Sequence, residues 1–169
     1  MKKNSHNIIR LFLANEQASA DFSSVLAKFL APPLSIGFSG EIGMGKTTLV
    51  RFLFKQMGIL TSIKSPTFSL VETYQMPTQG NRLSQKSIVL HHFDLYRIHD
   101  ESELDYIGFR DYFAVNAICC IEWPEKLSNG AVLDLLISLA RQGEGRTMSI
   151  QACSVPGDMV LRSIKKILC

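Results

Sequence analysis

The chain has 169 residues, of which 46% are hydrophobic and 20% are charged. This length suits one domain with a substantial core, and we expect residues 1–169 to form a single domain. The formal net charge of +3 excludes a dominant electrostatic surface for nucleic acid, so we expect contact with RNA to be local or to go through a partner.

Two further classes of protein are disfavoured. No secretory signal follows the basic start, and no run reaches ~18 apolar residues, so we expect a cytoplasmic protein that does not enter a membrane. The cysteines show no C-x-x-C spacing, which argues against a zinc site or a disulfide framework. We expect buried thiols at Cys119, Cys120, Cys153 and Cys169.

The first predicted elements precede a glycine-rich loop. Residues 7–13 alternate loosely between apolar and polar side chains and predict a strand. Asn15 can cap a helix that runs to about Ala31, whose apolar stripe consists of Phe22, Val25, Leu26, Phe29 and Leu30. The short apolar run 34–38 predicts a buried strand.

The next segment, residues 40–47, fits the pattern G-x-x-x-x-G-K-[ST] of a phosphate-binding loop. It lies between the predicted strand and an apolar helical pattern, 48–54, that ends near Gly58, which is the context this motif requires. Its backbone N–H groups can converge on phosphate oxygens, Lys46 can reach the β- and γ-phosphates, and the Thr47 hydroxyl can ligate magnesium. We expect a nucleotide site at Gly40, Glu41, Ile42, Gly43, Met44, Gly45, Lys46, Thr47 and Thr48.

The middle of the chain predicts two strands separated by a loop. Residues 65–67 open a predicted strand over 68–74. Residues 76–86 contain proline and a Gly-Asn pair and predict a mobile surface loop. Residues 87–93 predict the second strand.

A short helix and a buried strand are expected next. Asp100 can cap a helix that continues through Tyr106 and is interrupted at Gly108. Residues 117–123 form a near-continuous apolar run, which is typical of a central strand covered on both faces.

The C-terminal part predicts a hairpin and a helix. Residues 134–140 and 147–152 read as paired strands turned at 143–145, and residues 156–168 read as an amphipathic helix. The alternation of strands and helices predicts an α/β fold: a single P-loop NTPase-like domain with a mainly parallel central sheet and flanking helices.

Three polar residues are candidates for the chemistry of this site. Asp94 and Glu122 each end an apolar strand, where the ligand site of an open α/β sheet is expected. Each suits the acid that holds magnesium, and each could instead cap the following helix, so the residues alone leave the assignment open. Thr67 could close on magnesium or on the γ-phosphate as a switch residue, or it could simply open a strand.

Other side chains are weaker candidates. Trp123, the only tryptophan, could pack on the nucleotide, on a partner or in the core. His91 and His92 lack a third metal ligand at useful spacing and predict hydrogen-bonding strand residues. Arg97 and Arg110 could supply charge to a transition state, although surface arginines commonly remain in solvent.

Taken together, these motifs resemble the TsaE (YjeE) family, the small ATPases of bacterial tRNA threonylcarbamoyladenosine biosynthesis. The resemblance spans roughly residues 34 to 127, and its order and spacing are specific. The matching stretches are 40–48, 65–72, 92–97, Glu103-Leu104 with Gly108, and 121–125.

The resemblance implies a phosphate-loop fold, ATP or ADP bound with Mg²⁺, and weak ATP hydrolysis that partner proteins stimulate. The implied partners are the TsaD and TsaB proteins, with tRNA contacted only indirectly. By resemblance Thr47 and Glu122 would hold magnesium, Lys46 would contact the phosphates, Asp94 would orient or deprotonate water, and Thr67 would be the switch threonine.

The same resemblance places Trp123 beside the site. It does not identify the residues that contact the base, because the part of the chain after Leu127 matches the family only in outline. Our candidates for base contacts are Glu16, near the start of the first helix, and Arg146, after the glycine turn.

Three other functions compete with an ATPase. A small-molecule kinase needs an acceptor pocket and an arginine-rich lid, but the eight arginines are scattered. A GTPase would carry an Asn-Lys-x-Asp motif, and the sequence has none. A non-catalytic nucleotide sensor would keep the loop and Thr67 while lacking a competent acid at Asp94, and it stays open as an alternative.

Overall fold

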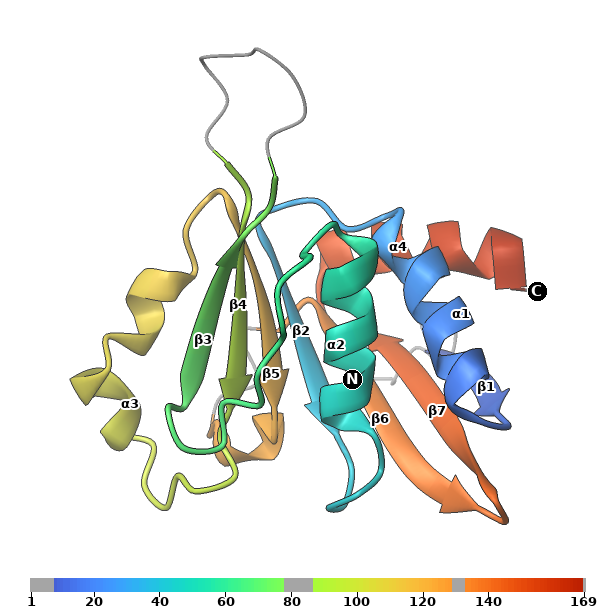
Figure 1. The fold of residues 1–169 in the computed structure, drawn as a ribbon, viewed down its shortest axis with the longest axis horizontal. Coiled ribbons are helices and arrows are strands. Elements are labelled where there is room, and N and C mark those ends of the chain that lie inside the picture. Colours follow the sequence, from blue (N-terminus) through green and yellow to red (C-terminus); the bar gives the residue numbers. More distant parts are fainter. Residues whose placement is uncertain (1–7, 78–86, 129–132, 169) are drawn as a thin grey trace.

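The computed structural model describes residues 8–77, 87–128 and 133–168. Within these ranges, seven strands form one sheet in the order β1-β7-β6-β2-β5-β4-β3 (Figure 1). The strands are β1 (Ile8–Leu13), β2 (Leu34–Ser39), β3 (Val71–Gln75), β4 (Val89–Asp94), β5 (Ala117–Glu122), β6 (Leu135–Gln142) and β7 (Gly145–Ala152). The helices are α1 (Glu16–Ala27), α2 (Lys46–Gln56), α3 (Glu103–Tyr106) and α4 (Val155–Leu168), with two 3₁₀ turns, η1 (Phe109–Tyr112) and η2 (Pro124–Lys126).

The sheet is parallel at its centre and antiparallel at both edges. Strands β6, β2, β5 and β4 run in one direction. At one edge β3 pairs antiparallel with β4. At the other edge β7 pairs antiparallel with β6, and β1 pairs antiparallel with β7. The predicted α/β fold with a parallel core and flanking helices is therefore confirmed. The carboxyl ends of β2, β4 and β5 consequently meet at one edge of the sheet, where ligands bind in open α/β folds.

Hydrophobic side chains cover the sheet on both faces. One core cluster joins the sheet to α1, α2 and α4 through residues such as Phe38, Phe54 and Ile164, and Figure 1 shows α1 and α2 in front of the sheet. A second cluster on the other face contains Phe93 and Phe109, whose ring centroids are 5.0 Å apart. Burial on two faces explains why every residue of β5 is buried and why the sequence there is continuously apolar.

The first helix is shorter than predicted. Asn15 caps α1 as expected, its side-chain oxygen accepting the Ala18 N–H at 3.0 Å, but the helix ends at Ala27 rather than near Ala31. The residue before a proline avoids the helical conformation, and Ala31 precedes Pro32. The stripe residues beyond the helix still pack against the core, so the hydrophobic pattern was correct although the boundary was wrong.

The strand predicted over 68–74 begins only at Val71. The Leu70 N–H donates to the Pro66 carbonyl at 2.8 Å and Leu70 has φ of 64°, so these residues form a tight turn that cannot continue a strand. Phe68 is 83% exposed in this turn. The loop predicted over 76–86 lies outside the described residues from 78 to 86.

Two further expectations need correction. Asp100 does not cap α3: its carboxylate accepts the Ser102 N–H at 2.8 Å in a preceding turn, and the helix begins at Glu103. Cys153 is exposed because it lies in the short link between β7 and α4, whereas Cys119 and Cys120 are buried thiols as predicted. Cys169 lies outside the described residues, and no described helix is long and apolar enough to cross a membrane.

Candidate functional site

The phosphate loop, residues 40–45, connects β2 to α2 at the edge where the central strands end (Figure 1). Gly40 and Gly45 have φ of 138° and 97°, values that favour glycine. A Cβ on Gly40 would lie 2.5 Å from the Leu139 carbonyl oxygen, so the loop can pass this close to β6 only with glycine. Gly45 immediately precedes α2, and the N–H groups of the first helical turn, which have no partners within the helix, are available to an anion.

Lys46 begins α2 and is buried inside the loop that it follows. Its Nζ donates to the carbonyl oxygens of Gly40 at 2.5 Å and Glu41 at 2.9 Å, and it lies 3.9 Å from the centroid of the Trp123 ring. Burial lowers the pKa of Lys46, and the surrounding carboxylates oppose this shift. The ammonium group is thus held at the mouth of the loop by weak neutral acceptors, which phosphate oxygens can replace.

Glu122, at the end of β5, forms a small network with two neighbours. The Thr47 hydroxyl lies 2.7 Å and 3.0 Å from its two carboxylate oxygens, Oε1 and Oε2. The His92 Nε2 lies 2.8 Å from Oε1. Glu122 is therefore attached both to the first turn of α2 and to the adjacent strand β4.

Asp94, at the end of β4, is held by two donors from different segments. The Thr67 hydroxyl donates to Oδ2 at 2.8 Å, and the Tyr96 N–H donates to Oδ1 at 3.0 Å. The Ser65 hydroxyl lies 2.9 Å from that of Thr67, which extends the network into the α2–β3 connection. The acid and the predicted switch threonine are therefore in direct contact.

These groups line one open pocket of about 350 Å³ beside the phosphate loop. It brings together residues from the loop, from the α2–β3 connection and from the ends of β4 and β5. The lining residues are Ile42, Gly43, Gly45, Lys46, Thr47, Thr48, Thr67, Asp94, Tyr96, Glu122 and Trp123. Gly40 and Glu41 instead line a neighbouring open depression, which Ile42 and Trp123 also line.

Trp123 forms a wall of this pocket. Its backbone has φ of 60°, its N–H donates to the Phe38 carbonyl at 3.1 Å, and its ring centroid is 5.1 Å from that of Tyr96. A left-handed conformation is unusual for a bulky residue. Here the Lys46 ammonium lies over the face of the indole ring. Trp123 thus lies beside the loop, and it also packs against the second core cluster.

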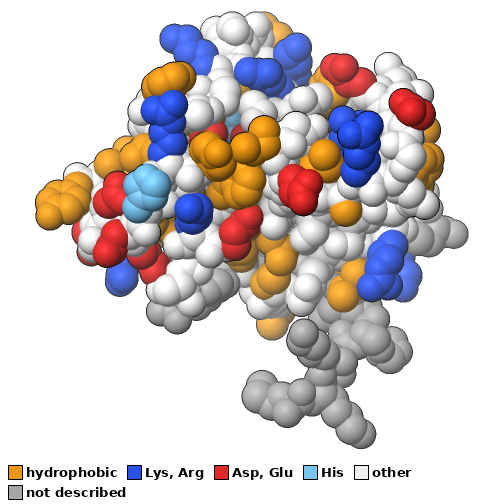
Figure 2. Space-filling model, turned by 90° about the horizontal axis from the view of Figure 1, so that it is seen from below, with side chains coloured by type: hydrophobic (Ala, Val, Ile, Leu, Met, Phe, Trp, Pro, Cys, Tyr) orange, Lys and Arg blue, Asp and Glu red, His pale blue; other side chains and the backbone are white. Residues whose placement is uncertain are grey.

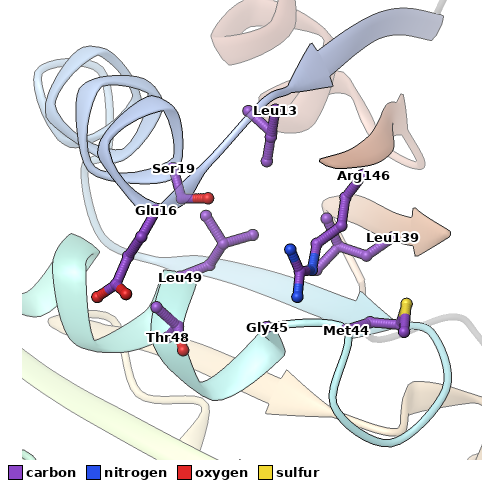
Figure 3. Close-up of a pocket in the computed structure, with 9 residues that line it drawn as sticks. All are labelled: Leu13, Glu16, Ser19, Met44, Gly45, Thr48, Leu49, Leu139 and Arg146. Carbon is purple, nitrogen blue, oxygen red and sulfur yellow. The ribbon is translucent and has the colours of Figure 1, made fainter. Parts of the chain in front are cut away.

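A second, smaller pocket of about 120 Å³ also borders the loop (Figure 3) and shares Gly45 and Thr48 with the first. It is lined by Glu16 from α1, Arg146 from β7, and Met44, Gly45 and Thr48 from the loop and α2. Figure 3 shows the Arg146 side chain extending from its strand toward the loop, and its Nη2 lies 3.5 Å from the Gly43 carbonyl oxygen. The two candidates for base contacts, far apart in sequence, thus flank the same cavity.

Neither of the other two arginine candidates lies in these pockets. The guanidinium of Arg97 lies 4.2 Å from the centroid of the Phe68 ring, and Arg110 is exposed on η1. Figure 2 shows the end of the molecule that carries the phosphate loop, with hydrophobic side chains gathered near its middle and charges of both signs scattered around them. This face therefore presents no broad field of one sign.

Sequence reasoning missed the contributions of His92 and Tyr96. His92 is a hydrogen-bonding strand residue as expected, but the sequence did not indicate that its partner is the acid Glu122. A usable signal was the alternation of side chains in a strand, because His92 and Asp94 are two residues apart and must share a face. Tyr96 gave no such signal because it follows the strand.

The site fits a cation that arrives with phosphates. Magnesium in nucleotide sites keeps several waters and takes only one or two oxygens from the protein. The Thr47 hydroxyl and the Glu122 carboxylate are such oxygens and lie 2.7 Å apart at their closest. Among the described residues, no group of three or more His, Cys, Asp or Glu side chains could hold a metal alone.

Comparisons with known proteins agree on one family. Residues 13–148 match the family model described as threonylcarbamoyl adenosine biosynthesis protein TsaE. The chain is 34% identical over 134 residues to tRNA threonylcarbamoyladenosine biosynthesis protein TsaE of Haemophilus influenzae, a match that covers 78% of each chain. The protein of the same name from Nostoc is 33% identical, with 70% of this chain and 69% of the relative covered.

A solved structure shares the fold. The crystal structure of YdiB from Bacillus subtilis matches with a TM-score of 0.72 and 21% identity, and 95% of each chain is covered. At this identity the likeness supports the fold alone.

Proposed function

The chain belongs to the TsaE family, and on that premise we propose that it is a magnesium-dependent ATPase acting in threonylcarbamoyladenosine modification of tRNA. Its partners in this proposal are TsaD-like and TsaB-like proteins in the cytoplasm, and it contacts tRNA only indirectly. The observation that carries the ATPase proposal is the convergence of the loop residues Lys46 and Thr47 with the strand-end acids Asp94 and Glu122 on one pocket.

In this proposal the phosphates of ATP lie on the loop and on the N-terminus of α2. The backbone N–H groups there and the Lys46 ammonium supply donors and positive charge. Lys46 exchanges the carbonyls of Gly40 and Glu41 for phosphate oxygens, which are stronger acceptors because they are charged.

The base of the nucleotide is assigned to the pocket of Figure 3. Leu13, Leu49 and Leu139 give this pocket apolar walls, while Glu16 and Arg146 supply polar groups at its sides. A planar base with polar edges suits such a lining.

Thr47 and Glu122 would hold Mg²⁺ through their side-chain oxygens. When bound, the cation neutralises charge on the phosphates and so favours attack on the γ-phosphorus. The Thr47–Glu122 hydrogen bond would give way to a bound cation, since the Thr47 hydroxyl oxygen and a Glu122 carboxylate oxygen would then be its ligands.

Asp94 acts as the acceptor for the attacking water. As the water oxygen bonds to the γ-phosphorus, its proton passes to the carboxylate, the bond from phosphorus to the β-phosphate oxygen breaks, and ADP leaves. The Thr67 hydroxyl donates to Oδ2 of Asp94 in the structure and so competes with the attacking water for this carboxylate. A turn of Thr67 toward the γ-phosphate would leave Oδ2 to the water, and a partner could favour this movement of the α2–β3 connection.

The same contact favours one alternative function. If Thr67 stays on Asp94 when ATP is bound and keeps the attacking water from the carboxylate, the chain acts as a nucleotide sensor without turnover.

The test is phosphate release from ATP by the purified chain, alone and mixed with TsaD-like and TsaB-like proteins, with and without magnesium. We expect slow release alone, a clear increase in the mixture, and loss of release without magnesium. ATP binding without any release in either sample would exclude the ATPase and leave the sensor.

A further inference from the structure

His92 on β4 is a polar side chain at a buried position where an apolar side chain would pack as well. It is 0% exposed, and its ring packs edge-on against Phe54, with centroids 6.1 Å apart. Its Nδ1 is buried and has no hydrogen-bond partner among the described residues. A buried imidazole with one nitrogen unpaired is unfavourable for folding compared with an apolar side chain of similar size.

The polar contact that His92 makes is with Glu122. Its Nε2 lies 2.8 Å from Oε1, and an ionised carboxylate can only accept, so Nε2 carries the proton and donates. Strand geometry fixes this pairing: His92 lies opposite Cys120 in the parallel β4–β5 pair, and Glu122 follows Cys120 by two residues on the same face.

This hydrogen bond restricts the rotation of the Glu122 carboxylate. The terminal torsion of a glutamate is broad, so without a second anchor the carboxylate can turn freely. His92 binds Oε1 from the β4 side, while the Thr47 hydroxyl contacts the carboxylate from the α2 side. Oε2 lies 3.0 Å from the Thr47 hydroxyl, the other oxygen assigned to the cation.

We propose that His92 is a positioning residue that holds the Glu122 carboxylate in the orientation that receives Mg²⁺ beside Thr47. This inference rests on the proposed function, since it assumes that Glu122 binds the cation. Hydrogen-bond partners behind a metal ligand typically contribute about 10- to 100-fold to metal affinity.

The neighbouring histidine provides a matched control. His91 is also buried, but it points to the other face of the sheet, where its Nδ1 lies 2.9 Å from the Thr73 hydroxyl and its ring packs against Tyr112. Burial lowers the pKa of His91. Its replacement removes a part-buried histidine hydrogen bond, here to a hydroxyl, without touching Glu122.

The experiment measures ADP affinity by calorimetry with and without Mg²⁺ and takes the ratio as the magnesium coupling. We expect His92→Leu to keep the magnesium-free affinity and to reduce the coupling about tenfold or more. His92→Gln, whose amide can still donate, should restore most of it, and His91→Leu should retain the wild-type coupling.

Two results would overturn the inference: unchanged coupling in His92→Leu, or an equal loss in His91→Leu. In a Glu122→Gln background, His92→Leu should cause no further loss, and additive losses would show that His92 does not act through Glu122. If the wild type itself shows no coupling, the proposed magnesium role fails instead.

A measurement on the wild-type chain covers the case in which His92→Leu does not fold. In ¹⁵N-histidine-labelled protein, Nε2 of His92 should carry the proton, and its signal should shift when Mg²⁺ is added to the ADP complex. Protonation at Nδ1 instead, or a signal that magnesium leaves unchanged, would contradict the proposal.

Discussion

The polar side chains around the phosphate loop form hydrogen bonds with one another. Lys46 is bonded to loop carbonyls, Thr47 to Glu122, and Thr67 to Asp94. Each of these hydrogen bonds already has one charged partner, so a bound nucleotide would replace existing charge-assisted bonds, and the net gain would be smaller than the new contacts suggest.

Replacing Lys46 with alanine should weaken ATP binding about ten- to hundredfold, because a hydrogen bond to a charged group contributes about 1.5–3 kcal/mol. Calorimetry measures the change. Lys55→Ala, an exposed lysine near the end of the same helix, is the control and should bind as the wild type does. Equal affinity of Lys46→Ala and the wild type would contradict the phosphate site.

The two acids should be separable by substitution. Asp94→Asn should keep nucleotide affinity and lower phosphate release about a hundredfold or more, since an amide cannot accept the proton. Glu122→Gln should instead raise the magnesium concentration needed for binding, because a hard cation requires the charged oxygen. The reverse pattern in the two variants would mean that their roles are exchanged.

Trp123 is the only tryptophan and gives an unambiguous optical signal. The Lys46 ammonium lies 3.9 Å above its ring, and it should leave this position when it turns to the phosphates. We expect the emission of Trp123 to shift when ADP and magnesium are added. Constant emission, with binding verified by calorimetry, would show that neither the ring nor Lys46 changes its surroundings.

At the scale of elements, the sequence predicts the helices and strands that leave a recognisable pattern in consecutive residues. The spacing of glycine, lysine and threonine is sufficient to predict the phosphate loop and the helix after it. Strand β5 is predicted because burial on both faces makes its sequence continuously apolar. The turn before β3 was missed because Leu70 adopts φ of 64°, a conformation that its side chain disfavours and that only the hydrogen bond to Pro66 and the surrounding fold impose.

Contacts between distant elements could not be predicted from local pattern. Glu16 and Arg146 face one pocket because β1 and β7 pair antiparallel. This pairing places the first residues of β7, next to the β6–β7 turn, beside the end of β1 and the start of α1. The bond from His92 to Glu122 likewise depends on the register of β4 against β5.

The close packing of helix α4 against Asp134 requires a glycine at position 157. Asp134 receives hydrogen bonds from the side chains of Ser35 in β2 and Ser154, which immediately precedes α4. A Cβ on Gly157 would lie 1.8 Å from the Asp134 carbonyl oxygen. Because backbone must move to relieve this clash, Gly157→Ala should lower the free energy of unfolding by about 2 kcal/mol or more.

Urea denaturation measures this loss of stability. Lys165→Ala, at an exposed position of the same helix, is the control and should change stability by only about 0.5 kcal/mol. Wild-type stability of Gly157→Ala would show that α4 is not held against Asp134 as described.

At the scale of the whole molecule, the sheet order explains how the site is assembled. Parallel β2, β5 and β4 end at one edge, so the loop after β2 and the acids ending β4 and β5 meet there, although they lie far apart in sequence. We propose that the chain works as a single domain whose nucleotide state is passed to partners through the Thr67 connection. A ligand shifts such an equilibrium only by its difference in affinity for the two states, so ATP and ADP must differ in affinity for the assembled complex.

The most direct test of this account is reconstituted threonylcarbamoyl transfer to tRNA over multiple turnovers with TsaD-like and TsaB-like proteins, with and without this chain. The account predicts that sustained product formation requires the chain, and that a Thr47→Ala, Asp94→Asn double variant cannot replace it. Equal product yield with and without the chain, or full activity of the double variant, would contradict it.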